Sequence, residues 1–220
     1  MLQTPWVKRG LLRILLGLFL VLAMLTSFGH YLDTSLTLHM IVQHAFYLIG
    51  GFLITAGADM LVLAWSGVSS TASRAYSALL RINATYNKRG LVTFFIAGLL
   101  VWYWHLPVNF DAAVLDESIH ILMHTTFMVV GSLIFAGSKL LTWRVRTFLL
   151  LIPSKAMGIF GAFLMFTSGY IYSVYPEWQQ TQCGLAMVVM MLGMDLTLVP
   201  FWLYKYFQAP TAPPSQAMGR

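Results

Sequence analysis

Long apolar runs separated by short polar segments make up most of this chain. Six of these runs reach or approach the length of about 20 residues that a helix needs to cross a bilayer. The pattern predicts an all-α fold: a polytopic membrane helical bundle with six transmembrane helices, forming a single domain over residues 1–207. The predicted spans are 10–29, 36–66, 91–107, 118–138, 147–174 and 181–206.

Two segments lie outside the apolar runs. Residues 67–90 are more polar, and within them residues 74–86 place apolar side chains at helical spacing beside Arg74 and Arg81. This pattern is typical of a helix that lies on the surface of an anionic leaflet, so residues 67–90 are predicted to be a cytoplasmic interfacial segment. Residues 208–220 contain three prolines and no apolar period, and they are predicted to be a disordered tail.

Composition agrees with a membrane protein. The chain is 59% hydrophobic and only 9% charged, whereas an ordinary soluble domain has roughly 25% charged residues. The formal net charge of +6 could suggest binding to nucleic acid, but in a membrane protein the distribution of Lys and Arg reports orientation first. We therefore interpret the charge as topology and expect membrane lipid, not nucleic acid, as a partner.

All 13 Lys and Arg residues fall on one side of a six-span arrangement. Because cytoplasmic loops collect Lys and Arg, this side is predicted to be cytoplasmic and to hold both termini of a multi-pass protein of the cell membrane. The loops on the opposite side, which would face the periplasm or exterior, carry no basic residue and five acidic ones: Asp33, Asp111, Asp116, Glu117 and Glu177.

Three further charged residues, Asp59, Lys155 and Asp195, lie within or near the inner halves of the predicted spans. A lone carboxylate at that depth is costly, so a basic partner is expected. We predict that Lys155 pairs with Asp195. A structural ion pair between the last two spans is favoured over a proton path.

The histidines are distributed unevenly. On the predicted topology all six lie in the outer halves or at the outer ends of the first four spans: His30, His39, His44, His105, His120 and His124. His120 and His124 are spaced i,i+4, so they share one helical face and can hold a single ion. Met40 and His44 have the same spacing, and thioether with imidazole is a ligand set suited to Cu(I). The alternative for His30 and His105 is that each lies among lipid headgroups without a ligand.

His39 and His44 are separated by five residues, which is about 140° around an α-helix. They are not expected to point at one central site together, and His44 is preferred. The predicted copper site consists chiefly of His120 and His124, with His44 and then His105 or Met40 completing the set. His39 is the remaining candidate ligand.

Other chemistries find little support. The single Cys183 excludes an intramolecular disulfide and any CxxC metal site. The chain has no GxSxG, HExxH or P-loop motif, which are the marks of common hydrolytic and nucleotide-binding sites. We therefore expect that the protein is not an enzyme.

Several motifs resemble those of one known family. Trp104-His105-Leu106-Pro107, the stretch from Asn109 to Asp111, and then His120-x3-His124 match two histidine segments in order, and the stretch from His39 to His44 matches a third. Gln180-x-Gln182-x-Gly184-x2-Met187 matches a Gln-rich entry to a late helix. Over residues 36–195 the chain resembles the CtaG family of cytochrome c oxidase assembly factors, associated with caa3 oxidases. The resemblance implies a role in copper delivery to, or maturation of, a copper-dependent oxidase.

These observations favour a membrane copper-binding assembly or accessory protein whose partner is a copper-dependent membrane enzyme complex of the respiratory chain, an oxidase or a monooxygenase. One alternative is a membrane cytochrome with haem b, in which His44 and His124, or His105 and His120, supply axial imidazoles from facing helices. The other is a purely structural accessory subunit of a membrane oxidoreductase.

Overall fold

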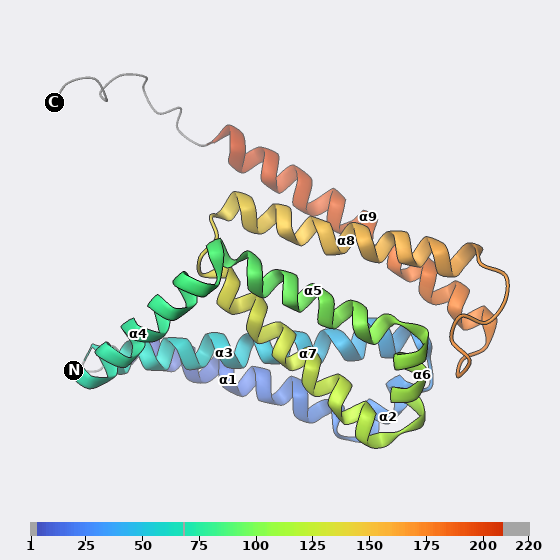
Figure 1. Cartoon of the computed structure of the whole chain (residues 1–220), viewed down its shortest axis with the longest axis horizontal. Coiled ribbons are helices and arrows are strands. Elements are labelled where there is room, and N and C mark those ends of the chain that lie inside the picture. Colours follow the sequence, from blue (N-terminus) through green and yellow to red (C-terminus); the bar gives the residue numbers. More distant parts are fainter. Residues whose placement is uncertain (1–3, 68, 209–220) are drawn as a thin grey trace.

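The computed structural model describes residues 4–67 and 69–208, and this part of the chain is almost entirely helical (Figure 1). The all-α membrane fold predicted from the apolar runs is confirmed. The elements, in chain order, are α1 (Thr4–Met24), α2 (Ser27–Asp33), the π-helix η1 (Leu38–Gln43), α3 (His44–Ser66), α4 (Ser70–Tyr86), the short 3₁₀ helix η2 (Lys88–Gly90), α5 (Leu91–His105), α6 (Pro107–Leu115), α7 (Glu117–Ser138), α8 (Trp143–Phe166) and α9 (Glu177–Phe207).

Four helices are long and apolar enough to cross a membrane without a break: η1 continued by α3, α7, α8 and α9. Two further candidate spans are bent pairs of helices. The axes of α1 and α2 differ by 62°, and those of α5 and α6 by 69°. If each bent pair is one span, the described residues cross the membrane six times, as the sequence predicts.

The bends and ends of these helices differ from the predicted spans. The run 10–29 is interrupted at Leu25 and Thr26, where the Thr26 hydroxyl accepts a hydrogen bond from Phe28 N–H and begins a new helix. The run 91–107 is followed by the separate helix α6, which Pro107 begins. The run 147–174 remains helical only to Phe166. Residues 167–176 form a loop instead, which we call the α8–α9 loop.

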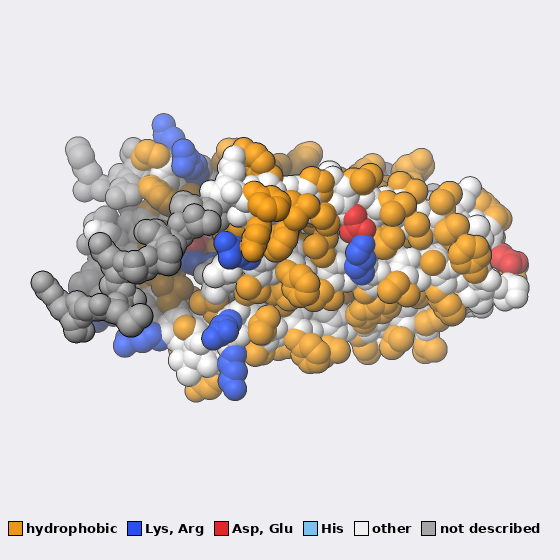
Figure 2. Space-filling view, turned by 90° about the horizontal axis from the view of Figure 1, so that it is seen from above, with side chains coloured by type: hydrophobic (Ala, Val, Ile, Leu, Met, Phe, Trp, Pro, Cys, Tyr) orange, Lys and Arg blue, Asp and Glu red, His pale blue; other side chains and the backbone are white. Residues whose placement is uncertain are grey.

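The helices form a bundle with two distinct ends (Figure 1). Helix α3 packs against α1 on one side and α7 on the other, α5 packs against α7, and α8 and α9 form a hairpin. We call the end with α2, η1, α6 and the α8–α9 loop the histidine end. The opposite end carries α4, the start of α1 and the end of α9, and we call it the basic end. The space-filling view shows apolar side chains along most of the length, with Lys and Arg gathered toward one end (Figure 2).

Helix α4 corresponds to the interfacial segment predicted within residues 67–90. Each of its described side chains is at least partly exposed, and large apolar residues such as Leu79 and Ile82 are among the exposed ones. The amphipathic pattern is therefore not used to form a core contact, which is consistent with a helix lying on a membrane surface. Of the predicted tail 208–220, only Gln208 lies within the described residues.

Two glycines bring α3 and α7 into backbone contact. A Cβ added at Gly51 would lie 2.0 Å from Met128 O, and one added at Gly131 would lie 2.0 Å from Leu48 O. Both helices start at the histidine end and run in the same direction (Figure 1). His44 precedes Gly51 by seven residues and His124 precedes Gly131 by seven, so the glycine contact places these two histidines at one level, two turns closer to the histidine end.

The three charged residues predicted near the inner halves of the spans, Asp59, Lys155 and Asp195, all have partners of opposite charge. The ammonium group of Lys155 on α8 contacts the carboxylate of Asp195 on α9, which confirms the predicted pair. Asp59 on α3 accepts from Lys139 Nζ, just after α7, and from the hydroxyl of Tyr76 on α4. The two inner carboxylates of the apolar spans thus have cationic partners.

Candidate metal centre

Five of the six histidines form one group at the histidine end. The ring centroids of His120 and His124 are 4.2 Å apart, and those of His39 are 5.2 Å from both His44 and His120. His44 in turn lies 6.0 Å from His124 and 5.8 Å from His105. These rings come from η1, α3, α5 and α7, so the group joins elements that are far apart in the sequence.

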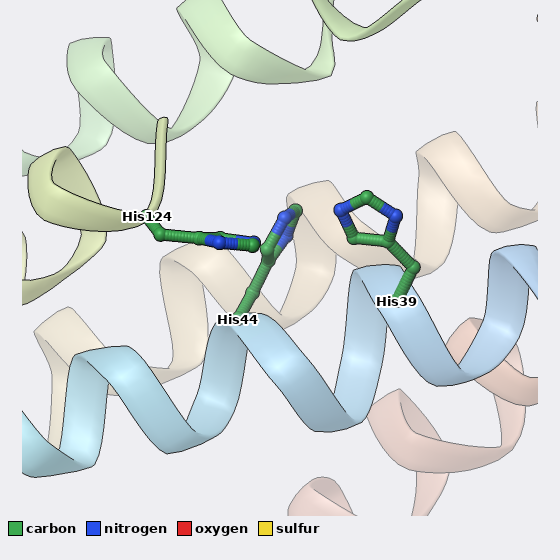
Figure 3. Close-up of side chains that lie close together, drawn as sticks. All are labelled: His39, His44 and His124. Atoms are coloured by element: carbon green, nitrogen blue, oxygen red, sulfur yellow. The ribbon is translucent and has the colours of Figure 1, made fainter. Parts of the chain in front are cut away.

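The π-helix η1 explains how His39 and His44 share a site. The His44 N–H donates to the carbonyl oxygen of His39, five residues earlier, and this wider turn returns the fifth residue to the same face. The expected angular separation of about 140° assumed regular α-helical geometry, and it is wrong here. Figure 3 shows the rings of His39 and His44 beside each other, with His124 reaching toward them from α7.

His39, His44 and His124 form a buried group of three imidazoles. One ring nitrogen from each lies within 4.8 Å of the others, and the three residues are 0%, 4% and 5% exposed. Within the described residues, His39 Nε2, both ring nitrogens of His44, and His124 Nε2 have no hydrogen-bond partner. Because unpartnered buried polar atoms are costly, a bound ion that accepts their lone pairs fits this arrangement.

Tyr175 of the α8–α9 loop sets the tautomer of His39. Burial raises the pKa of Tyr175, so its hydroxyl keeps its proton and donates it to the carbonyl oxygen of Asp33 at 2.8 Å. The same hydroxyl lies 3.1 Å from His39 Nδ1 and must accept there, since its one proton is already used. Nδ1 then carries the ring proton, and the lone pair is on Nε2, available to a metal.

A second group of possible ligands shares His39. Asp33, His39 and His120 also place one ligand atom each within 4.8 Å of the others. Asp33 Oδ1 lies 3.5 Å from His39 Nδ1 and 3.7 Å from His120 Nε2. Asp33 and His120 are partly exposed, so this group lies between the surface and the buried imidazoles.

The remaining predicted residues lie at the edge of this arrangement or outside it. His105 Nδ1 donates to Val101 O at 2.7 Å, which leaves Nε2 free, but His105 is not part of either group. The sulfur of Met40 lies 3.8 Å from Cys183 Sγ on α9. His30 is exposed and also belongs to neither group.

Two residues of the site were not assigned to it from the sequence. Asp33 was noted only as an outer charge; its position six residues before His39 was the available signal. Tyr175 is 136 residues from its partner His39, and no spacing pattern indicates that contact.

The α8–α9 loop closes the histidine end. Tyr172 is fully buried and its hydroxyl donates to the carbonyl oxygen of His105, while Ser173 donates to Asp111 Oδ2. Just after the loop, Gln179 Oε1 accepts from Leu36 N–H. The loop and the start of α9 are therefore fastened to the segments on which the histidines lie.

Comparison with known proteins agrees with this arrangement. A family model described as cytochrome c oxidase caa3 assembly factor matches residues 3–209, nearly the whole chain. No curated protein and no solved structure matches. An assembly factor associates with a membrane oxidase complex and is not itself catalytic. The chain, a multi-pass membrane protein, therefore belongs to the cytochrome c oxidase caa3 assembly factor family.

Proposed function

We propose that this assembly factor holds a single Cu(I) ion at His39, His44 and His124 and delivers it to a copper-dependent membrane oxidase. The observation that carries the proposal is the convergence of three buried imidazoles, each with at least one ring nitrogen that has no hydrogen-bond partner among the described residues. His120 is the next residue in the ligand set, because its ring lies beside that of His124.

The charge of the site favours a monovalent ion. The three central ligands are neutral imidazoles, and imidazole suits copper as well as zinc and iron. With no carboxylate in the buried group, a divalent ion would bring two uncompensated charges into a dry environment, whereas Cu(I) brings one. The proposed partner is the membrane oxidase that this family assembles, and a copper-dependent oxidase would need to receive copper ions.

The two ligand groups suggest a route for the ion. Asp33 and His120 are partly exposed, and His39 belongs to both groups. An ion first held by Asp33 and His120 can pass to the buried imidazoles, because His39 lies beside His120 and belongs to the buried group. We further propose, from the distribution of Lys and Arg, that this end faces the periplasm or exterior.

Metal analysis tests the proposal. Protein purified in detergent and loaded with copper under reducing conditions should contain one copper per chain by mass spectrometry. His44→Ala and His124→Ala should lose most of it, while His30→Ala, which alters an exposed histidine outside both groups, should keep it. Circular dichroism of each variant verifies that the helices are retained.

The visible absorption spectrum of protein purified from its native membrane distinguishes the copper site from the main alternative, a haem b site. A haem b site needs a flat space between two axial imidazoles, but His44 stacks on Phe127 with centroids 4.0 Å apart and His124 stacks on Tyr47 at 4.3 Å. We therefore favour the single ion. A Soret band that disappears in His124→Ala would refute the copper site in favour of haem. Equal copper content in all variants would refute any metal site among these histidines.

A further inference from the structure

A hollow with four cationic lining residues lies at the basic end, opposite the histidine end. This open hollow of about 370 Å³ is lined by side chains of α1, α3, α7 and α8 and by Lys139. We propose that this hollow binds the phosphate group of an anionic phospholipid. Four of its lining residues are cationic: Arg9, Arg13, Lys139 and Arg146.

The cations are only partly neutralised by the protein. Asp59 is the one acidic residue in the lining, and its carboxylate is already held by Lys139 and by the hydroxyl of Tyr76. Within the described residues, no carboxylate lies within 4.0 Å of Arg9 or Arg13, since the ion pairs there join other residues. The hollow therefore carries an excess of positive charge from several helices.

An anionic ligand would suit Arg13, which lies near the edge of the apolar run of α1. It lies one turn beyond Gly10, within the apolar run of α1, and Gly10 packs so closely on α3 that an added Cβ would lie 3.0 Å from Gly57 O. A guanidinium on such a span is costly without an anionic partner. The planar guanidinium also binds phosphate oxygens in pairs, a geometry that lysine lacks.

The surroundings favour a lipid over a free phosphate ion. Trp6 and Phe135 line the hollow beside the cations, and tryptophan is typical of the headgroup level of a membrane. Leu16 follows Arg13 at i+3 on the same face of α1 and is 47% exposed. A phospholipid whose phosphate is held by Arg9 and Arg13 would thus find an apolar surface beside it for its acyl chains.

Native mass spectrometry of the full chain, purified in detergent, tests this site. The parent protein should retain added phosphatidylglycerol in preference to phosphatidylcholine. In Arg9→Gln/Arg13→Gln the bound fraction should correspond to roughly 30-fold weaker binding, as expected for the loss of two cations near a lipid phosphate. The control Lys8→Gln/Arg144→Gln removes the same charge from residues outside the lining and should bind as the parent does. Arg9→Lys/Arg13→Lys should recover only part of the loss.

Two results would overturn the proposal. Equal loss of phosphatidylglycerol in both glutamine double variants would mean diffuse attraction to positive charge instead of a site. Retention of inorganic phosphate with no preference between the two lipids would mean a site for a free anion. Copper content is measured on the same samples and should not change, so failure of this site is distinguishable from failure of the copper site.

Discussion

The hydroxyl of Tyr175 lies 3.1 Å from Nδ1 of His39, joining the loop before the last helix to the π-helix that begins the second span. Since that hydroxyl also donates to Asp33 O, it fixes both the ring orientation and the tautomer of His39. Hydrogen-bond partners of this kind orient metal-binding histidines and raise their basicity.

Replacing Tyr175 with Phe should therefore weaken Cu(I) binding by about 10- to 100-fold, the usual effect of removing such a partner. Competition with a chromogenic Cu(I) chelator measures the change. Tyr170→Phe is a matched control, because Tyr170 belongs to the same loop but is 69% exposed. Unchanged affinity in Tyr175→Phe would mean that His39 does not bind the ion through Nε2.

The π-turn can be tested by changing its length. Deleting Ile41 leaves His39 and His44 four residues apart, so a regular α-helical turn would again place them on one face. This variant should keep its copper. Inserting one alanine after Ile41 separates them by six residues and should abolish most copper binding, as measured by metal content. The opposite pattern would show that the shared face of these two histidines is irrelevant.

The glycine contact between α3 and α7 should be intolerant of any side chain. Gly131→Ala places a Cβ 2.0 Å from Leu48 O, which forces the helices apart at a typical cost of about 1–3 kcal/mol. We expect a lower melting temperature in detergent and reduced copper content, because His44 and His124 separate. Gly98→Ala is the control, since nothing lies within 4 Å of its added Cβ. A Gly131→Ala variant as stable as the parent would contradict the close packing.

The Lys155 and Asp195 pair predicts non-additive effects. Asp195→Asn alone leaves an ammonium group on an apolar span without its partner, so it should lower expression and thermal stability more than the double variant Lys155→Met/Asp195→Asn does. Thermal unfolding of the two single variants and the double variant measures the coupling free energy between Lys155 and Asp195. If the double variant is no better than the worse single variant, the pair does not contribute as an ion pair.

Orientation in the membrane can be read by cysteine labelling. Asp116, the residue just before α7, is exposed at the histidine end, so Asp116→Cys should react with an impermeant maleimide in intact cells. The native Cys183 is buried and should give little background. Arg74→Cys, at the basic end, should react only after lysis. The reverse result would invert the topology and place the copper site on the cytoplasmic side.

The sequence indicated much of this architecture because apolar runs and basic residues are direct consequences of the membrane. The helices and the gathering of histidines at one end follow from those patterns. The pairing of Lys155 with Asp195 was predicted from the cost of a lone carboxylate within an apolar span. The bends after Met24 and His105 were missed, since apolarity continues across both breaks while the backbone direction changes.

The ligand set was harder to predict than the fold. His39 was ranked below His44 because regular helical periodicity was assumed, and a π-turn leaves no distinct mark in composition. His120 and His124 are adjacent as their i,i+4 spacing implies. The spacing could not show, however, that His39 and Asp33 both lie beside His120, since that proximity depends on the packing of η1 against α7.

The α8–α9 loop is synthesised after all of the histidines, and this order affects when the site can form. Every histidine lies between positions 30 and 124, whereas Tyr172, Tyr175 and Gln179, which fasten the histidine end, leave the ribosome later. Chains insert and fold from the amino terminus as they are made. A nascent chain that has completed α7 therefore holds every imidazole without the contact that sets the tautomer of His39, and the site reaches its full affinity only when the final hairpin inserts.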